Sequence, residues 1–182
     1  MISTTYIAII IALFAGIGLI DGFYYHIWKF KLYKWEESRY EHGLHSARAL
    51  LFPVIIYLLF IKNIGGVVLW LALLIALIDI SVLVVDVLTE YNSRELLGGL
   101  PDKEYLVHII ANGLHFTYLF TLFGMTEFSH WSLDSSNSLY DVTPFAIFIT
   151  WQAIIGGVVL GIVHILLPII VKPISLKVIY ES

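Results

Sequence analysis

Residues 41–61 read EHGLHSARALLFPVIIYLLFI, a segment that opens with charged and imidazole side chains and is apolar from Ala49 onward. With the few residues before it, the segment is long enough to cross a bilayer, which takes about 20 mainly apolar residues. Ionisable side chains within a membrane span are costly and are candidates for function by default. The four at the mouth of this helix are Glu41, His42, His45 and Arg48.

The composition of the whole chain agrees with a membrane protein. Of its 182 residues, 59% are hydrophobic and 13% are charged, and the mean hydropathy is +0.89. The charged share is about half that of soluble domains. The formal charge of −4 argues against nucleic acid as a partner. The absence of cysteine excludes thiolate metal sites, iron–sulfur clusters and c-type haem attachment.

Five apolar segments predict an all-α integral membrane protein. We expect a single bundle of five transmembrane helices forming one domain over residues 1–182, with spans at about 5–28, 38–61, 66–90, 102–124 and 144–171. The N-terminus lacks the basic region of a secretory signal, so the first segment is expected to be a retained span. Gly157 and Gly161 have the spacing that allows close helix approach. Residues 92–102 are expected to form a short loop.

The distribution of basic residues predicts the orientation. Eight of them fall on the first connection, the third connection and the C-terminal tail, whereas Lys62 alone falls on the second connection. The positive-inside rule then places the N-terminus outside and the C-terminus in the cytoplasm of a multi-pass protein of the cell (cytoplasmic) membrane. The eight residues are Lys29, Lys31, Lys34, Arg39, Arg94, Lys103, Lys172 and Lys177.

This topology brings polar pairs on four helices to one membrane face. Three of the pairs have i,i+4 spacing, which projects two side chains from one helix face. Asp21 and His26 are five residues apart, which fits one face less well, and His42 precedes His45 by three. At 1.5 Å per residue, His45 and His108 are expected roughly 5–12 Å inside the helix mouths. The pairs are Asp21/His26, Glu41/His45, Asp86/Glu90 and Glu104/His108.

Carboxylates on four helices with imidazoles on three of them are the ligand types of a carboxylate-bridged dinuclear site. Such ligands suit iron, manganese or zinc, with iron favoured here. Di-iron bundle proteins use Glu and Glu-x-x-His motifs, so the likeness is one of ligand type and not of motif. The predicted metal ligands are Asp21, His26, Glu41, His42, His45, Asp86, Glu90, Glu104 and His108.

The predicted function is a metal-dependent membrane oxidoreductase that acts on an apolar or lipid-like substrate among the membrane lipids, as a homo-oligomer or within a larger membrane complex. Arg48, one turn from the ligands, is expected to orient a carboxylate, and His115, two turns beyond His108, is a second catalytic candidate. Asp79 lies in mid-membrane and is expected to face the bundle interior, and His164 is a possible extra ligand.

Other interpretations remain open. The polar pairs could be hydrated interface residues or salt bridges, for instance Glu41 with Arg48 and Glu90 with Arg94. A zinc-dependent membrane hydrolase would use the same ligand types. Haem could be held by facing histidines, although the many carboxylates at the same depth argue against it. A metal or proton transporter and a non-catalytic subunit or assembly factor are the remaining classes.

Overall fold

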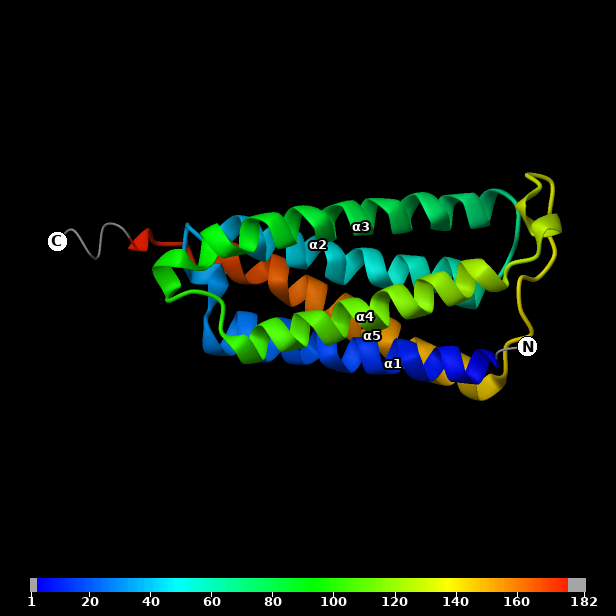
Figure 1. Ribbon diagram of the computed structural model, residues 1–182, viewed down its shortest axis with the longest axis horizontal. Coiled ribbons are helices and arrows are strands. Elements are labelled where there is room, and N and C mark those ends of the chain that lie inside the picture. The colour runs from blue at the N-terminus through cyan, green and yellow to red at the C-terminus, as the bar shows by residue number, and fades with distance from the viewer. Residues whose placement is uncertain (1–2, 177–182) are drawn as a thin grey trace.

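In the computed structural model, which describes residues 3–176, five long helices lie side by side (Figure 1). Two of them continue as π-helices, Ile20–Lys29 after α1 and Tyr57–Lys62 after α2. The described residues form no β-strand, and short 3₁₀ helices occur only in the connections. The long helices are α1 (Thr4–Leu19), α2 (Arg39–Ile56), α3 (Val67–Arg94), α4 (Asp102–Met125) and α5 (Pro144–Ile170).

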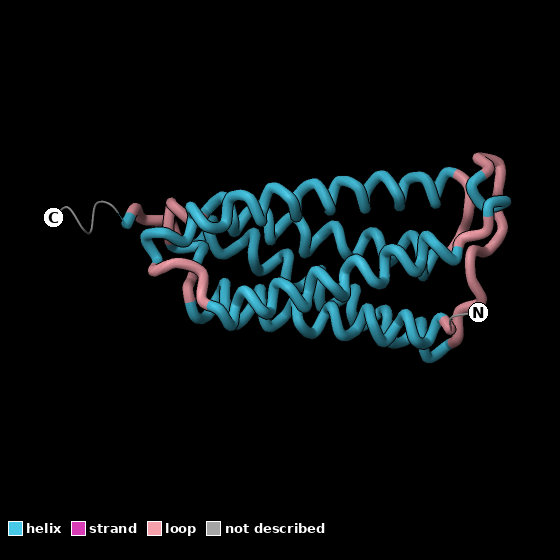
Figure 2. The backbone as a smooth tube through the Cα atoms, in the orientation of Figure 1, coloured by secondary structure: helices cyan, strands magenta, loops and turns pink. Residues whose placement is uncertain are grey.

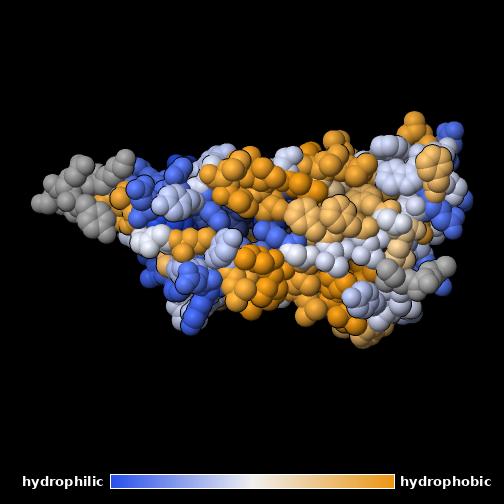
Figure 3. All heavy atoms as spheres, in the orientation of Figure 1, coloured by the Kyte–Doolittle hydropathy of each residue, from blue (hydrophilic) through white to orange (hydrophobic). Residues whose placement is uncertain are grey.

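The prediction of five helices long and apolar enough to cross a membrane is confirmed. Figure 3 shows apolar residues over the middle of the bundle and hydrophilic residues gathered toward the end from which the C-terminus extends. The architecture is that of a multi-pass membrane protein. The spans are Thr4–Lys29, Arg39–Lys62, Val67–Leu97, Asp102–Met125 and Pro144–Ile170.

The third helix is longer than expected. It continues through Arg94 and one 3₁₀ turn, Glu95–Leu97, so the loop expected over residues 92–102 is reduced to a few residues. No helix breaker precedes Gly98, and this residue and Gly99 take φ values of +93° and +84°, which end the helix. The additional turn carries Arg94 into the bundle, where it is fully buried.

The helices pack in the order α3, α2, α5, α1 and α4, each against its neighbours in that series. The contact between α2 and α5 depends on the two glycines with i,i+4 spacing. A Cβ atom on Gly157 would lie 2.8 Å from Pro53 Cγ, and one on Gly161 would lie 2.6 Å from Leu50 Cδ2. Only glycine fits so near the facing helix, which agrees with the close approach predicted from the sequence.

The connections gather at the two ends of the bundle (Figure 2). The α1–α2 and α3–α4 connections lie at the same end as the C-terminal end of α5, and the N-terminus and the other two connections lie at the opposite end. Seven of the eight basic residues assigned to one face are therefore grouped at one end. Lys177, the eighth, lies outside the described residues.

The interior of the bundle differs between its two ends. Toward the N-terminus of α1 it is apolar, with fully buried side chains from four helices, among them Ile7, Ile11, Ile55, Leu59, Leu69 and Leu122. Loop residue Tyr140 closes this end, where its hydroxyl donates a 2.5 Å hydrogen bond to the Leu122 carbonyl. Burial raises the pKa of Tyr140 to about 12. Toward the opposite end, the buried side chains are mostly charged groups and histidines.

Candidate metal centre

The π-helix after α1 decides how Asp21 and His26 lie. In an α-helix, side chains five residues apart point about 140° away from each other. Hydrogen bonds from residue i+5 to residue i widen the turn, and here they run through the whole segment Ile20–Lys29. His26 Nε2 consequently lies 3.4 Å from Asp21 Oδ1, on the same side of the helix. Short π-helical segments occur frequently at functional sites.

Helices α2 and α3 bring a second imidazole to this place. His45 Nε2 lies 2.9 Å from Asp86 Oδ2, and its Nδ1 lies 3.7 Å from Asp21 Oδ2. At 2.9 Å the first contact is the shortest between a histidine nitrogen and a carboxylate oxygen in this cluster. The rings of His45 and His26 have centroids 4.0 Å apart.

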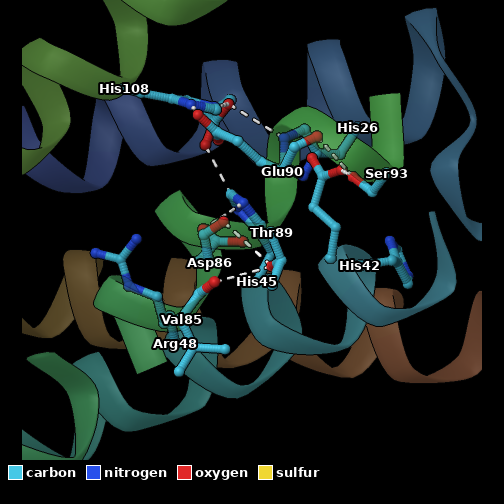
Figure 4. A network of polar contacts seen from close by, with 12 residues as sticks. His26, His42, His45, Arg48, Val85, Asp86, Thr89, Glu90, Ser93 and His108 are labelled. Atoms are coloured by element: carbon cyan, nitrogen blue, oxygen red, sulfur yellow. Dashed lines mark hydrogen bonds and ion pairs between the residues drawn. The ribbon is translucent and has the colours of Figure 1, made fainter. Parts of the chain in front are cut away.

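Helix α4 supplies the third imidazole. His108 Nε2 lies 3.0 Å from Asp21 Oδ1, and His108 Nδ1 lies 3.2 Å from Glu90 Oε2. Figure 4 shows His108 with carboxylates on two sides and the His45–Asp86 pair below it. Both ring nitrogens of His108 therefore face carboxylate oxygens from different helices.

Four of the predicted ligands form one compact group. Asp21, His26, His45 and His108 each offer one ligand atom, and these atoms all lie within 4.8 Å of one another. Three more carboxylates contact the histidines of the group: Asp86 and Glu90 as described, and Glu104, whose Oε1 lies 3.5 Å from His26 Nε2. At least one member of each of the four predicted pairs thus lies in a buried cluster that could hold a metal ion.

The distances in this cluster suit metal coordination. Two donor atoms bound to one ion at about 2.0–2.2 Å are roughly 3.0–3.4 Å apart in octahedral or tetrahedral geometry. The contacts described above run from 2.9 to 3.7 Å. Several buried donor atoms have no hydrogen-bond partner among the described residues: both ring nitrogens of His26, Asp86 Oδ1 and Glu104 Oε2. Buried polar atoms are rarely left unpaired, so an ion or a water is expected beside these atoms.

Glu41, which was predicted as a ligand, is engaged by Arg94. The guanidinium Nε and Nη2 both lie 2.8 Å from Glu41 Oε1, and Nη2 lies 2.6 Å from Glu104 Oε1. Ser93 donates a further hydrogen bond to Glu41. All three charged side chains of this clamp are fully buried. Glu41 is therefore joined to the cluster through Arg94 and Glu104.

The sequence interpretation missed Arg94 as a site residue. It considered Arg94 as a basic residue that sets the orientation and as a salt-bridge partner of Asp86 or Glu90, although Glu90 and Arg94 are four residues apart and share a helix face with Asp86. That spacing was the signal that could have placed Arg94 in the site.

His42, also predicted as a ligand, points to another partner. Its Nε2 forms a 2.8 Å hydrogen bond with the His164 carbonyl, and the two imidazole rings stack at 4.6 Å. His164 Nε2 in turn lies 3.1 Å from the Gly22 carbonyl on the π-helix. These contacts join α2, α5 and the π-helix beside the cluster, and the ligand atoms of neither residue belong to the compact group.

A second polar group lies deeper along the same helices. His115 Nε2 lies 3.1 Å from Asp79 Oδ2, and Arg48 Nε lies 3.7 Å from Asp79 Oδ1. Tyr118 contacts the other ring nitrogen of His115, at 3.2 Å. Arg48 thus reaches the carboxylate of Asp79 and not that of Asp86, and Asp79 faces the bundle interior as predicted. These four residues form a polar layer separate from the group of Asp21, His26, His45 and His108.

No family model, curated protein or solved structure matches this chain at a significant level. The interpretation of the site rests on its own residues.

Proposed function

We propose that this protein is a metal-dependent integral membrane enzyme, a dinuclear oxidoreductase of the di-iron type acting on an apolar or lipid-like substrate. The observation that supports this most is the meeting of three imidazoles and four carboxylates from four helices in one buried cluster. The proposed ligands are Asp21, His26, His45, Asp86, Glu90, Glu104 and His108.

The number of donors favours two ions. Tetrahedral zinc takes four ligands, and the cluster offers seven side chains. Asp21 lies between the histidines, with Oδ1 toward His26 and His108 and Oδ2 toward His45. Because its two oxygens face different imidazoles, the Asp21 carboxylate could be shared between two ions, and carboxylates are the main ligands in bundle di-iron proteins.

The charge balance of the buried cluster also supports a site with two ions. The carboxylates of Asp21, Glu41, Asp86, Glu90 and Glu104 number five, and Arg94 is the one guanidinium among them, which leaves a formal charge of −4 with neutral histidines. Uncompensated charge is very costly to bury. Two divalent cations would neutralise it. Three imidazolium ions with ring centroids 4.0 to 6.1 Å apart would instead repel one another.

Iron is the proposed metal because oxygen and imidazole ligands suit it and because di-iron sites in helix bundles use this ligand combination. The ions would supply redox chemistry. The protein's own contribution is to hold them in a buried place, with the Arg94 clamp orienting Glu104 and the His42–His164 pair fixing the π-helix. A cavity of about 120 Å³ beside Asp21 and His45 has mainly apolar walls, which favours an apolar substrate.

The orientation is part of the proposal. The cluster lies at the end of the bundle that carries most of the basic residues, and the positive-inside rule assigns this end to the cytoplasmic face of the cell membrane. Substrate would then reach the cavity laterally from the inner leaflet. A cysteine placed by Ser136→Cys, at an exposed position of the α4–α5 loop, should react with an impermeant thiol reagent added outside intact cells.

Elemental analysis of detergent-purified protein tests the proposal. We expect two equivalents of iron per chain, falling below half in Asp21→Asn and His108→Ala. Asp134→Asn, an exposed carboxylate of the α4–α5 loop, is the matched control and should retain the full content. Folded protein that takes up neither iron, manganese nor zinc would refute the metal centre. Two equivalents of zinc would favour a hydrolase over the proposed oxidoreductase. A Soret band in the absorption spectrum would favour a haem protein.

A further inference from the structure

The cavity beside the metal cluster has two polar sides. Between α1, α2 and α5 it is lined by Phe14, Phe52 and Leu160 and by several glycines and alanines. Asp21 and His45 reach it from the metal cluster, and Arg48 and Asp79 reach it from the deeper polar layer. A molecule in this cavity would therefore contact both polar groups at once.

Arg48 has donor capacity to spare. Its Nε has no hydrogen-bond partner among the described residues, and the nearest carboxylate oxygen, on Asp79, is 3.7 Å away. A guanidinium carries five N–H donors, and leaving a buried one such as this Nε–H unpaired is costly. Figure 4 shows the guanidinium turned away from the His45–Asp86 pair. A hydrogen-bond acceptor on a bound molecule would satisfy the Nε–H donor.

The charge of this layer limits which acceptor fits. Asp79 already balances Arg48, so the layer is formally neutral with His115 uncharged. An anionic group would add an uncompensated negative charge in mid-membrane, which is expensive. A carbonyl or hydroxyl oxygen accepts from Arg48 without that cost.

The size of the cavity limits the rest of the molecule. An engineered apolar cavity of about 150 Å³ binds benzene. The present cavity, at about 120 Å³, would hold a headgroup of roughly one six-membered ring. Leu19 and Gln152 line the cavity and are exposed on the outside of the bundle, so an attached chain could leave toward lipid between α1 and α5.

We infer that the cavity binds an uncharged, ring-sized headgroup with a carbonyl or hydroxyl oxygen, which Arg48 holds by hydrogen bonding while the ring lies against Asp21 and His45. The attached alkyl chain lies in the membrane. This inference rests on the proposed function, because the adjacent metal cluster is what makes the bound molecule a substrate.

Three probes with the same ring and tail separate the possibilities: 4-pentylphenol, pentylbenzene and 4-pentylbenzoate. Each is titrated calorimetrically into the full chain in nanodiscs, with empty nanodiscs subtracted for partitioning. We expect 4-pentylphenol to bind at least tenfold more tightly than the other two. Arg48→Lys keeps the charge but loses the planar donor array, and it should weaken the phenol at least tenfold and leave pentylbenzene unchanged.

A cavity-filling variant keeps the test valid if Arg48→Lys folds poorly. A Cβ atom on Gly156 meets nothing within 4 Å, and this residue lines the cavity, so the side chain of Gly156→Leu should occupy space in the cavity and weaken binding at least tenfold. Gly16 is equally unobstructed but does not line the cavity, and Gly16→Leu should bind the phenol like the unmodified chain.

The results of these binding titrations can be told apart from the results of the elemental analysis. Equal binding of phenol and pentylbenzene, tighter binding of the benzoate, or unchanged binding in Gly156→Leu would each overturn the inference, whatever the metal content. The titration is repeated after chelation, because the contact with Arg48 does not require the ions. Selective phenol binding by a chain that never takes up metal would uphold the headgroup site and refute the proposed enzyme.

Discussion

Replacing Arg94 by methionine should destabilise the protein strongly. The side chain is fully buried, and it bonds two carboxylates, Glu41 and Glu104, that are themselves fully buried. Methionine fills similar space but leaves both carboxylates without a counter-charge. Removing one partner of a buried ion pair typically costs about 3–5 kcal/mol, and here one residue serves two pairs. We expect the loss in the free energy of unfolding to lie at the upper end of that range.

The assay is equilibrium unfolding in mixed detergent micelles, followed by tryptophan fluorescence after chelation of metal. Chelation removes any stabilisation by bound ions, so that only the protein's own contacts are compared. Adding Glu41→Gln and Glu104→Gln to Arg94→Met removes the stranded charges. Because neutral replacements of buried ion groups are often nearly neutral in stability, the triple variant should recover most of the loss. Arg39→Met, at an exposed arginine of the same end, should stay within about 0.5 kcal/mol of the unmodified chain.

A loss below about 1 kcal/mol in Arg94→Met would refute the argument, since it would mean that the clamp is solvated. Additive losses in the triple variant would refute it in another way. Groups in one network are expected to show coupling, and strict additivity would mean that Arg94, Glu41 and Glu104 do not interact in the folded protein.

Three other predictions follow from the fold and the site. The Cβ atom of Gly161→Ala would lie 2.6 Å from Leu50 Cδ2, so this variant should lower the free energy of unfolding by about 1–3 kcal/mol. Gly113→Ala has open space at its Cβ, and its free energy of unfolding should equal or exceed that of the unmodified chain. The pKa of Tyr140 is raised from 10.0 to about 12, so this residue contributes stability that is present below pH 10 and lost as pH rises toward 12. Tyr140→Phe should remove this part of the pH dependence, which is measured as the unfolding midpoint against pH. Ferrous iron at about 100 times its dissociation constant should stabilise the unmodified chain by about 2.7 kcal/mol for each of the two proposed ions, measured in the same unfolding assay without the chelation step, and Asp21→Asn should lose most of this gain.

The fold could be predicted from the sequence because hydropathy alone specifies membrane spans. The bilayer requires about 20 apolar residues for each crossing, and five segments meet that requirement. The end of α3 was predicted less well, since charged residues beyond Glu90 resemble a helix leaving the membrane. In the structure, Arg94 remains helical because its partners lie inside the bundle.

The residue types of the site could be predicted from the sequence, but which of these residues contact one another could not. An i,i+4 spacing identifies pairs that share a helix face, and the pairs on α3 and α4 do reach the cluster. The pairing of Asp21 with His26 could not be read from α-helical spacing, because it depends on the π-helix. Nor could spacing show that Glu41 would turn to Arg94, since that depends on which buried cation lies nearest.

The two polar layers differ in charge, and this difference explains why we assign metal to only one of them. Helix α3 repeats an aspartate after seven residues, Asp79 and Asp86, and helix α4 repeats a histidine after seven, His108 and His115. Both layers therefore start from the same carboxylate and imidazole pattern. In the deeper layer Arg48 neutralises the single carboxylate, so a cation there would add charge instead of removing it. In the proposed metal site five carboxylates face one guanidinium, so bound cations there would remove charge instead of adding it.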